Sequence, residues 1–251
     1  MLSLIGLGLY DEKDLTLRGI EEAKNSDKVY IELYTGKWGG SLEKLSELIG
    51  KEIVQLKRKD LEENSKKILQ EAKGKRIVVF VQGDPLVATT HSSLLMEAKR
   101  NNIETRVIHN ASIFSAIAET GLHIYKFGQA ATIPFPEKTG GKPPQSVYDA
   151  IKENQKRGLH TLCLLDVVAE ENRYLDVKQA LETLLALEKS NKNNVIDGKS
   201  KIVVFNVRKS SGIAYGSISR LVNEDIWLPA AIVIPGKLHF SEKEYLELYE
   251  I

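Results

Sequence analysis

The residues best suited to chemistry lie in a short loop after an apolar run. Residues 76–82 combine β-branched and apolar side chains, which predicts a buried strand. Gly83, Asp84 and Pro85 then break the strand, because Gly tolerates unusual dihedral angles and Pro fixes φ. One carboxylate beside several free backbone N–H groups suits a hydroxylated, charged ligand. An ordinary connection with Asp84 as a turn residue is the alternative, and the loop taken alone favours it.

A glycine-containing loop ends the first predicted strand. Residues 6–11 read Gly-Leu-Gly-Leu-Tyr-Asp and follow an apolar run over residues 2–5. Asp11 occupies the place of the third glycine of a dinucleotide-binding loop, and its carboxylate would face a pyrophosphate unfavourably. The sequence therefore disfavours NAD, while the glycines still allow the backbone to approach a ligand or another strand closely.

A third candidate follows the predicted strand 105–108. Ser112 can cap a helix that runs to residue 119, and the unpaired N–H groups of a helix start suit a carboxylate. A plain N-cap explains the serine equally well. His109 is either a base or, as is more common for a lone histidine, a hydrogen-bonded structural residue. The residues by themselves assign no catalytic group.

Alternating strands and helices position these loops. This alternation predicts an α/β chain with a mostly parallel N-terminal sheet, whose carboxyl edge is where ligands bind. We predict domains over residues 1–112 and 113–251, with a cofactor cleft between them. Asp14, Thr89 or Thr90, and a capping box of Ser241 and Glu244 are the predicted helix starts. The predicted strands are 2–5, 28–33, 52–56, 76–82, 105–108, 130–133, 159–168, 201–207 and 230–234. The predicted helices are 15–24, 42–49, 61–72, 90–100, 112–119, 146–156, 177–187 and 241–249, and residues 214–221 fit either type.

Composition excludes several classes of protein. The chain has 251 residues, of which 42% are apolar and 27% are charged. Its net charge of +1 provides no overall electrostatic attraction to nucleic acid or to an anionic membrane. Its one cysteine, Cys163, permits no intrachain disulfide and no cysteine-built zinc site. No apolar run approaches the ~20 residues of a membrane helix, and no secretory signal precedes the first strand. We expect a cytoplasmic protein without a metal.

Four strings of the sequence carry a resemblance to a known family. They are residues 6–10 (Gly-Leu-Gly-Leu-Tyr), 83–91 (Gly-Asp-Pro-Leu-Val-Ala-Thr-Thr-His), 122–128 (Leu-His-Ile-Tyr-Lys-Phe-Gly) and 235–239 (Pro-Gly-Lys-Leu-His). Together they resemble the diphthine synthase branch of the tetrapyrrole-methylase superfamily, over essentially the whole chain. The resemblance implies a tetrapyrrole-methylase-like fold.

The resemblance also implies an activity. Members use S-adenosyl-L-methionine, which becomes S-adenosyl-L-homocysteine, to methylate the amino group of the aminocarboxypropyl-histidine of translation elongation factor 2. The archaeal-type enzymes end in a trimethylammonium, an intermediate of diphthamide biosynthesis. Residues 124–127, an exposed apolar stretch, and the resemblance both predict a homodimer. One wall of the cleft is expected to open so that the spent cofactor can leave, and loops 138–144 and 208–212 are the candidates. The basic second loop is either a cationic mouth for an anionic cofactor tail or a protein substrate, or a solvated turn. The predicted cofactor contacts are Leu9, Asp84, Val87, Ser112, Ile113, Leu164, Leu165, Val207 and Ala230.

Two other functions stay open. A methylase of a corrin or uroporphyrinogen has the same fold, but its Gly-Pro-Gly-Asp first loop is missing here. A nucleotide-binding module without chemistry would keep the loops and lack turnover. Leu164 and Leu165 illustrate the ambiguity, because leucines that could line an adenine pocket are most often only core.

Overall fold

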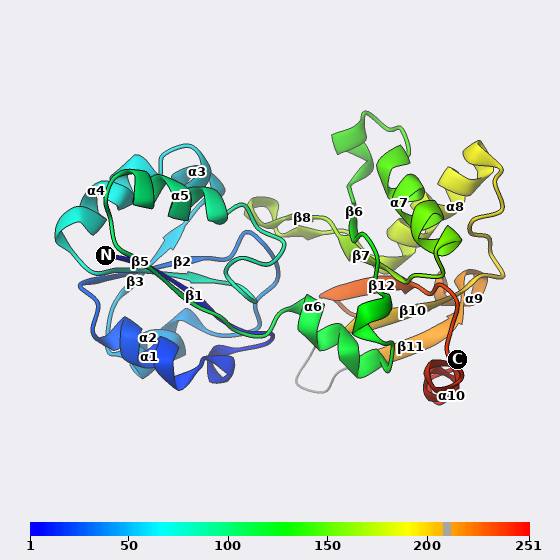
Figure 1. Cartoon of the computed structure of the whole chain (residues 1–251), viewed down its shortest axis with the longest axis horizontal. Helices are drawn as coiled ribbons and strands as arrows, with labels where there is room; N and C mark the ends of the chain where they lie inside the picture. The colour runs from blue at the N-terminus through cyan, green and yellow to red at the C-terminus, as the bar shows by residue number, and fades with distance from the viewer. Residues whose placement is uncertain (208–211) are drawn as a thin grey trace. The chain divides into compact units, whose positions relative to one another are not determined.

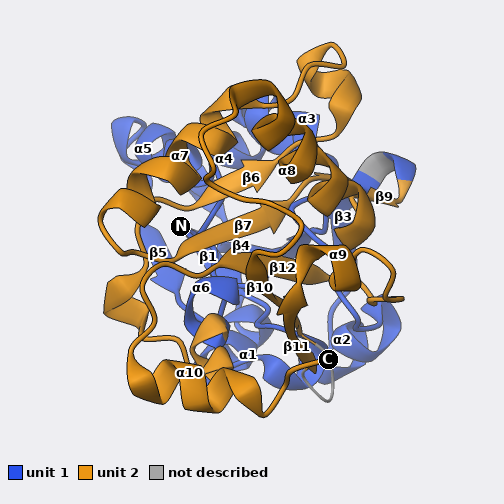
Figure 2. Cartoon of the chain, turned by 90° about the vertical axis from the view of Figure 1, so that its right-hand side faces the viewer, with its two compact units in different colours: residues 1–116, 169–171 blue, residues 117–168, 172–251 orange. Residues whose placement is uncertain are grey.

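The computed structural model describes residues 1–207 and 212–251 and forms two compact units. Unit 1 comprises residues 1–116 and 169–171, and unit 2 comprises residues 117–168 and 172–251 (Figure 2). Most of the basic loop predicted as a cationic mouth, residues 208–211, lies outside the described residues.

Unit 1 is built on a five-stranded parallel sheet in the order β3-β2-β4-β1-β5. The central strands are short, fully buried apolar runs, as sheets covered on both faces require. Leu4 pairs with Val79 on one side and with Val107 on the other, which places the carboxyl ends of β1, β4 and β5 along one edge. The strands are β1 (Leu2–Gly6), β2 (Lys28–Glu32), β3 (Ile53–Leu56), β4 (Ile77–Val81) and β5 (Thr105–Ile108).

Helices cover both faces of this sheet (Figure 1). Successive strand residues point to opposite faces, so Leu4 and Ile5 belong to different core clusters. One cluster contains Ile5 and residues of α1 (Leu17–Lys24) and α2 (Leu42–Ile49). The other contains Leu4 and residues of α3 (Arg58–Glu62), α4 (Lys66–Gly74) and α5 (Ser92–Arg100). The predicted parallel α/β architecture is confirmed.

Unit 2 has a mixed sheet in the order β11-β10-β12-β7-β6, in which only the β6–β7 pair is parallel. Helices α7 (Gln145–Lys156), α8 (Val177–Asn191) and α9 (Ile218–Leu221) pack on a core that includes the buried Cys163. The undecided residues 214–221 divide between β11 and α9. The strands are β6 (Ala131–Ile133), β7 (Thr161–Leu165), β10 (Lys201–Asn206), β11 (Gly212–Ser217) and β12 (Ala230–Ile234), with a hairpin of β8 (Val167–Val168) and β9 (Arg173–Tyr174).

Several predicted boundaries are wrong. The helix over 61–72 is two helices, α3 and α4, and the strand over 159–168 ends at Leu165, before the hairpin. The helix over 112–119 is a four-residue α-helix, α6 (Ile113–Ala116), followed by a 3-10 turn at Ile117–Thr120. Thr16 and not Asp14 caps α1, and α5 begins at Ser92, after His91, without a side-chain cap from either threonine.

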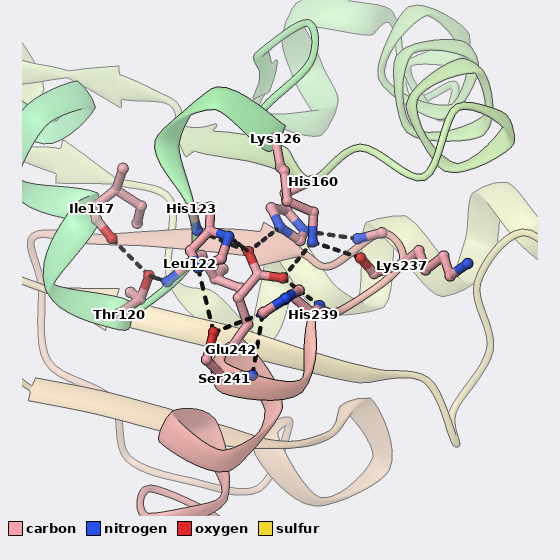
Figure 3. A network of polar contacts seen from close by, with 11 residues as sticks. Ile117, Thr120, Leu122, His123, Lys126, His160, Lys237, His239, Ser241 and Glu242 are labelled. Atoms are coloured by element: carbon pink, nitrogen blue, oxygen red, sulfur yellow. Dashed lines mark hydrogen bonds and ion pairs between the residues drawn. The ribbon is translucent and has the colours of Figure 1, made fainter.

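The last helix, α10 (Phe240–Glu247), begins at a buried charge network (Figure 3). Its capping box pairs His239 with Glu242, so the predicted Ser241–Glu244 box is wrong. The Glu242 carboxylate, which is 0% exposed, accepts from the backbone N–H groups of His123 at 2.8 Å and His239 at 2.7 Å and from Nζ of Lys126. It also lies 3.1 Å from Nε2 of His160. Glu242 thereby joins strings 122–128 and 235–239 of the sequence.

Within residues 1–207 and 212–251, no helix is long and apolar enough to cross a membrane.

Candidate functional site

The candidate site in unit 1 is built from the loops that follow β1, β4 and β5. The first two loops form an antiparallel bridge, in which Gly8 and Gly83 exchange N–H···O bonds of 3.2 and 3.1 Å. Both glycines have positive φ, 82° and 68°, which glycine adopts without steric cost. A Cβ on Gly6 would lie 2.5 Å from the carbonyl oxygen of Gly83, so no larger residue fits there.

Two side chains fix the first loop, and neither was predicted to do so. The Asp14 carboxylate accepts from the backbone N–H groups of Leu9 at 3.1 Å and Tyr10 at 2.6 Å. The Asn110 amide donates to the carbonyl oxygens of Gly6 at 3.0 Å and Asp14 at 2.9 Å. Asn110 therefore ties the loop after β5 to the loop after β1. The amide of Leu9, a predicted cofactor contact, is already bonded within the protein.

Asp84 is the centre of the second loop. Its side chain is 7% exposed, and its Oδ1 accepts from the Leu86 N–H at 3.0 Å. Its Oδ2 accepts from the Asn110 N–H at 3.2 Å and lies 2.8 Å from Nδ1 of His109. The carboxylate therefore orients the loops after β4 and β5. Val87 lies in the same loop, its N–H bonded to the Asp84 carbonyl at 3.3 Å.

Ser112 and Ile113 lie at the start of α6. Ser112 is buried and Ile113 is partly exposed, and the Ser112 N–H donates to the Ser115 hydroxyl at 3.0 Å. A Cβ on Gly83 would lie 3.7 Å from the Ser112 Cβ, so the second and third loops are in contact. Unit 1 thus brings together the predicted Asp84, Val87, Ser112 and Ile113, together with the Gly8–Leu9 loop.

The predicted residues of unit 2 gather at one edge of its own sheet. Leu164 pairs with Ala231, next to Ala230, and Ala230 pairs with Asn206, next to Val207. Leu164, Leu165, Val207 and Ala230 are all partly exposed. The buried Oδ1 of Asn206 has no hydrogen-bond partner among the described residues.

A buried polar cluster adjoins the loop after β4, and no local sequence pattern indicated it. Glu32, at the end of β2, is 0% exposed and accepts from the Tyr34 N–H at 3.1 Å and the Thr35 hydroxyl at 2.8 Å. His91 Nε2 lies 3.4 Å from the Tyr34 hydroxyl and 4.0 Å from Oε1 of Glu32. Burial raises the pKa of Glu32 to about 7 and lowers the pKa of His91 to about 4. Both groups are therefore neutral near pH 6.

Comparison with known proteins identifies the family of this fold. Residues 1–198 match the family model described as tetrapyrrole (corrin/porphyrin) methylases. The chain belongs to the tetrapyrrole methylase family. Family membership makes it a methyltransferase that takes its methyl group from a donor cofactor.

Two similar relatives and one solved structure share a name. The chain is 46% identical, over 98% of both chains, to a protein of Methanocaldococcus jannaschii named diphthine synthase. It is 43% identical, again over 98% of both chains, to a diphthine synthase of Methanococcus maripaludis. A solved structure described as a crystal structure of diphthine synthase superposes with a TM-score of 0.89 at 35% identity, covering 99% of this chain and 95% of that one. The resemblance drawn from the four strings is confirmed, and the predicted cofactor contacts stay predictions.

Proposed function

We propose that the protein is an S-adenosyl-L-methionine-dependent N-methyltransferase that trimethylates the aminocarboxypropyl-histidine of translation elongation factor 2. The observation that carries the proposal is 46% identity over 98% of the chain to a protein named diphthine synthase. A corrin or uroporphyrinogen methylase is the second candidate, favoured only by the family description and weakened by the first loop of this chain. The proposed setting is the cytoplasm, in diphthamide biosynthesis.

The proposed cofactor set repeats the residues predicted from the sequence. In unit 1 it comprises Leu9, Asp84, Val87, Ser112 and Ile113, and in unit 2 Leu164, Leu165, Val207 and Ala230. When bound, S-adenosyl-L-methionine supplies a methyl group already activated by its sulfonium. The protein therefore has to orient a free amine in line with that methyl and exclude water. Loops held by Asp14, Asp84 and Asn110 support such orientation, because little of their backbone is left to reorganise on binding.

A homodimer forms part of the proposal. Tyr125 is 91% exposed and Ile124 is 42% exposed, in a stretch that also contains Phe127. Exposed apolar side chains in a cluster are typical of an interface. Light scattering over a wide concentration range should give twice the 28.1 kDa chain mass. A monomer mass throughout would remove the dimer and leave the activity untouched.

The activity is tested by mass spectrometry. Elongation factor 2 that carries aminocarboxypropyl-histidine is incubated with the protein and S-adenosyl-L-methionine, and we expect three methyl groups at that one residue. Uroporphyrinogen should gain none. Methylation of a lysine, or of the tetrapyrrole alone, would refute the proposal.

Calorimetry tests the cofactor site separately. Asp84→Ala removes the carboxylate that orients two loops and should weaken cofactor binding by about 1–3 kcal/mol, the range for a lost charged hydrogen bond. Asp225→Ala, an exposed carboxylate in unit 2, is the matched control and should bind as the wild type does. Equal affinity of both variants would count against the site.

A further inference from the structure

The ring of His109 is held by a contact with Asp84, although most of its side chain is exposed to solvent. His109 directly follows β5 (Thr105–Ile108), on the edge that carries Asp84 and Ser112. Its Nδ1 lies 2.8 Å from Oδ2 of Asp84, while its side chain is 69% exposed. An exposed histidine is normally free to rotate, whereas this one is held by a carboxylate that is only 7% exposed.

The contacts of Asp84 determine which ring nitrogen carries the proton. The carboxylate already accepts from the N–H groups of Leu86 and Asn110, so it acts as an acceptor for its neighbours. In a neutral imidazole, the nitrogen facing such an acceptor is the N–H donor and the other nitrogen keeps its lone pair. In its neutral form, His109 therefore donates from Nδ1 to Asp84 and keeps its lone pair on Nε2, in a side chain that is largely exposed.

The proposed reaction needs a group of this kind. Only an amine with a free lone pair can attack a methyl group, and an aliphatic amine is mostly protonated near neutral pH. A carboxylate that fixes the tautomer of a histidine is a recurrent arrangement for a general base.

Among the described residues of these loops, the other carboxylates and His91 are hydrogen-bonded within the protein or buried. Asp14 holds two backbone N–H groups, and Glu32 and His91 are at most 2% exposed. Among the described residues, Asp84 is the charged group that contacts the His109 ring.

We propose that His109 is the general base of methyl transfer, with Asp84 as its positioning residue. The inference rests on the proposed function. Nε2 of His109 takes a proton from the substrate ammonium and becomes an imidazolium beside the Asp84 carboxylate. The amine lone pair then forms the N–C bond as the C–S bond of the donor breaks, and the electron pair stays on sulfur. The exposed imidazolium releases its proton to water, and the cycle repeats before each further methylation.

Two substitutions at His109 separate the role of Nε2, the proposed proton acceptor, from the hydrogen bond between Nδ1 and Asp84. Asn in place of His109 sets an amide N–H near the position of Nδ1, so His109→Asn keeps a donor to Asp84 and loses Nε2. His109→Gln reaches the position of Nε2 with an amide that cannot accept a proton. We expect both variants to bind S-adenosyl-L-methionine within about threefold of the wild type by calorimetry. Single-turnover methyl transfer at pH 7 should fall about 10²- to 10⁴-fold, the usual contribution of general base catalysis.

The pH profile distinguishes a base from a structural residue. Without Nε2 the variants depend on amine that has lost its proton to water, so their rate should rise about tenfold per pH unit and approach the wild-type rate in alkali. Added imidazole should rescue His109→Asn. Rates within about threefold of the wild type, or a loss that is the same at every pH, would overturn the proposal.

A measurement without substrate decides the tautomer. Nitrogen-15 spectra of the imidazole should record a protonated Nδ1 and an unprotonated Nε2 in the neutral ring of His109, and lose that preference in Asp84→Ala. A proton on Nε2 in the neutral ring would reject the assignment, whatever the substrate is. If the wild type binds the cofactor yet leaves the modified elongation factor unmethylated, the proposed function fails, and the spectra still decide whether His109 is built as a proton acceptor.

Discussion

Glu242 offers the sharpest quantitative test of the structure. Burial alone would raise the pKa of its carboxyl, but hydrogen bonds from Lys126, from the His239 and His123 backbone and from His160 lower the pKa to about 2. Relative to the ordinary value of 4.5, this corresponds to about 3 kcal/mol in favour of the charged form in the folded state. Because the folded pKa lies below the unfolded one, this stability is present above pH 4.5 and is lost as pH falls toward 2.

Glu242→Gln removes the charge and keeps the shape. Lys126 then faces an amide, and the N–H groups of His123 and His239 compete for one oxygen instead of two. We expect the free energy of unfolding at pH 7 to fall by about 3–5 kcal/mol, the usual cost of removing one partner of a buried ion pair. The difference between wild type and variant should shrink by about 3 kcal/mol between pH 5 and pH 2.

Urea unfolding at several pH values measures this difference. Circular dichroism gives the overall transition, and hydrogen exchange in peptides of β12 and α10 restricts the measurement to unit 2. Glu244→Gln on the same helix is the control, because Glu244 is exposed; we expect a change within about 0.5 kcal/mol. A loss below about 1 kcal/mol for Glu242→Gln, or one that does not depend on pH, would refute the account of the network.

Two predictions concern unit 1. The folded pKa of Glu32 is raised from 4.5 to about 7, so wild-type stability falls as pH rises between these values; Glu32→Gln should stabilise the protein at pH 8 by up to about 3 kcal/mol relative to its effect at pH 4, as measured by urea unfolding. A variant that loses stability as pH rises from 4 to 8 relative to the wild type would contradict this. Gly6→Ala sets a Cβ 2.5 Å from the Gly83 carbonyl and should cost about 1–3 kcal/mol of stability and weaken cofactor binding, whereas Gly74→Ala meets open space and should be tolerated. Calorimetry and unfolding that do not separate these two variants would contradict the loop geometry.

The sheet of unit 1 could be predicted from the sequence because the local hydrophobic pattern of its strands agrees with their burial in the folded unit. The run over residues 76–82 is β-branched, short and followed by Gly and Pro, which predicts a buried strand, and the structure places Ile77–Val81 at the centre of the sheet. The Gly83-Asp84 break then positions a carboxylate at the carboxyl edge without long-range information. Ser112 reached the same edge because β5 is parallel to β1.

Two predicted helix starts were wrong because other contacts decide which side chain caps the helix. Ser241 and Glu244 have the spacing of a capping box, but Lys126 and His160, far away in sequence, draw Glu242 into the buried position instead. Asp14 is a fair N-cap in isolation, yet its carboxylate binds the N–H groups of Leu9 and Tyr10, which leaves the capping to Thr16.

Competing hydrogen bonds explain two further errors. The hydroxyl of Thr90 donates to Glu62 at 3.1 Å. The hydroxyl of Thr89 donates to the Pro85 carbonyl at 3.1 Å and accepts from the His91 N–H at 3.3 Å, which lies before the first residue of α5, so neither threonine caps the helix itself. Asp166 ends β7 because its carboxylate accepts from the N–H groups of Phe135 and Val167 and pairs with Lys138. The last contact also holds the start of loop 138–144, which was predicted to be mobile.

The polar groups of unit 1 divide orientation and chemistry between different side chains. The side chains of Asp14, Asn110 and Asp84 form hydrogen bonds with the backbone of the three loops, and these bonds are present without a ligand. Groups saturated in this way cannot also move protons during a reaction, but they fix positions at little further cost in entropy. His109 differs because Nδ1 contacts Asp84, while Nε2 has no hydrogen-bond partner among the described residues. If the donor is S-adenosyl-L-methionine, as proposed above, its methyl is already activated, and orientation, exclusion of water and a proton acceptor are the contributions left to the protein.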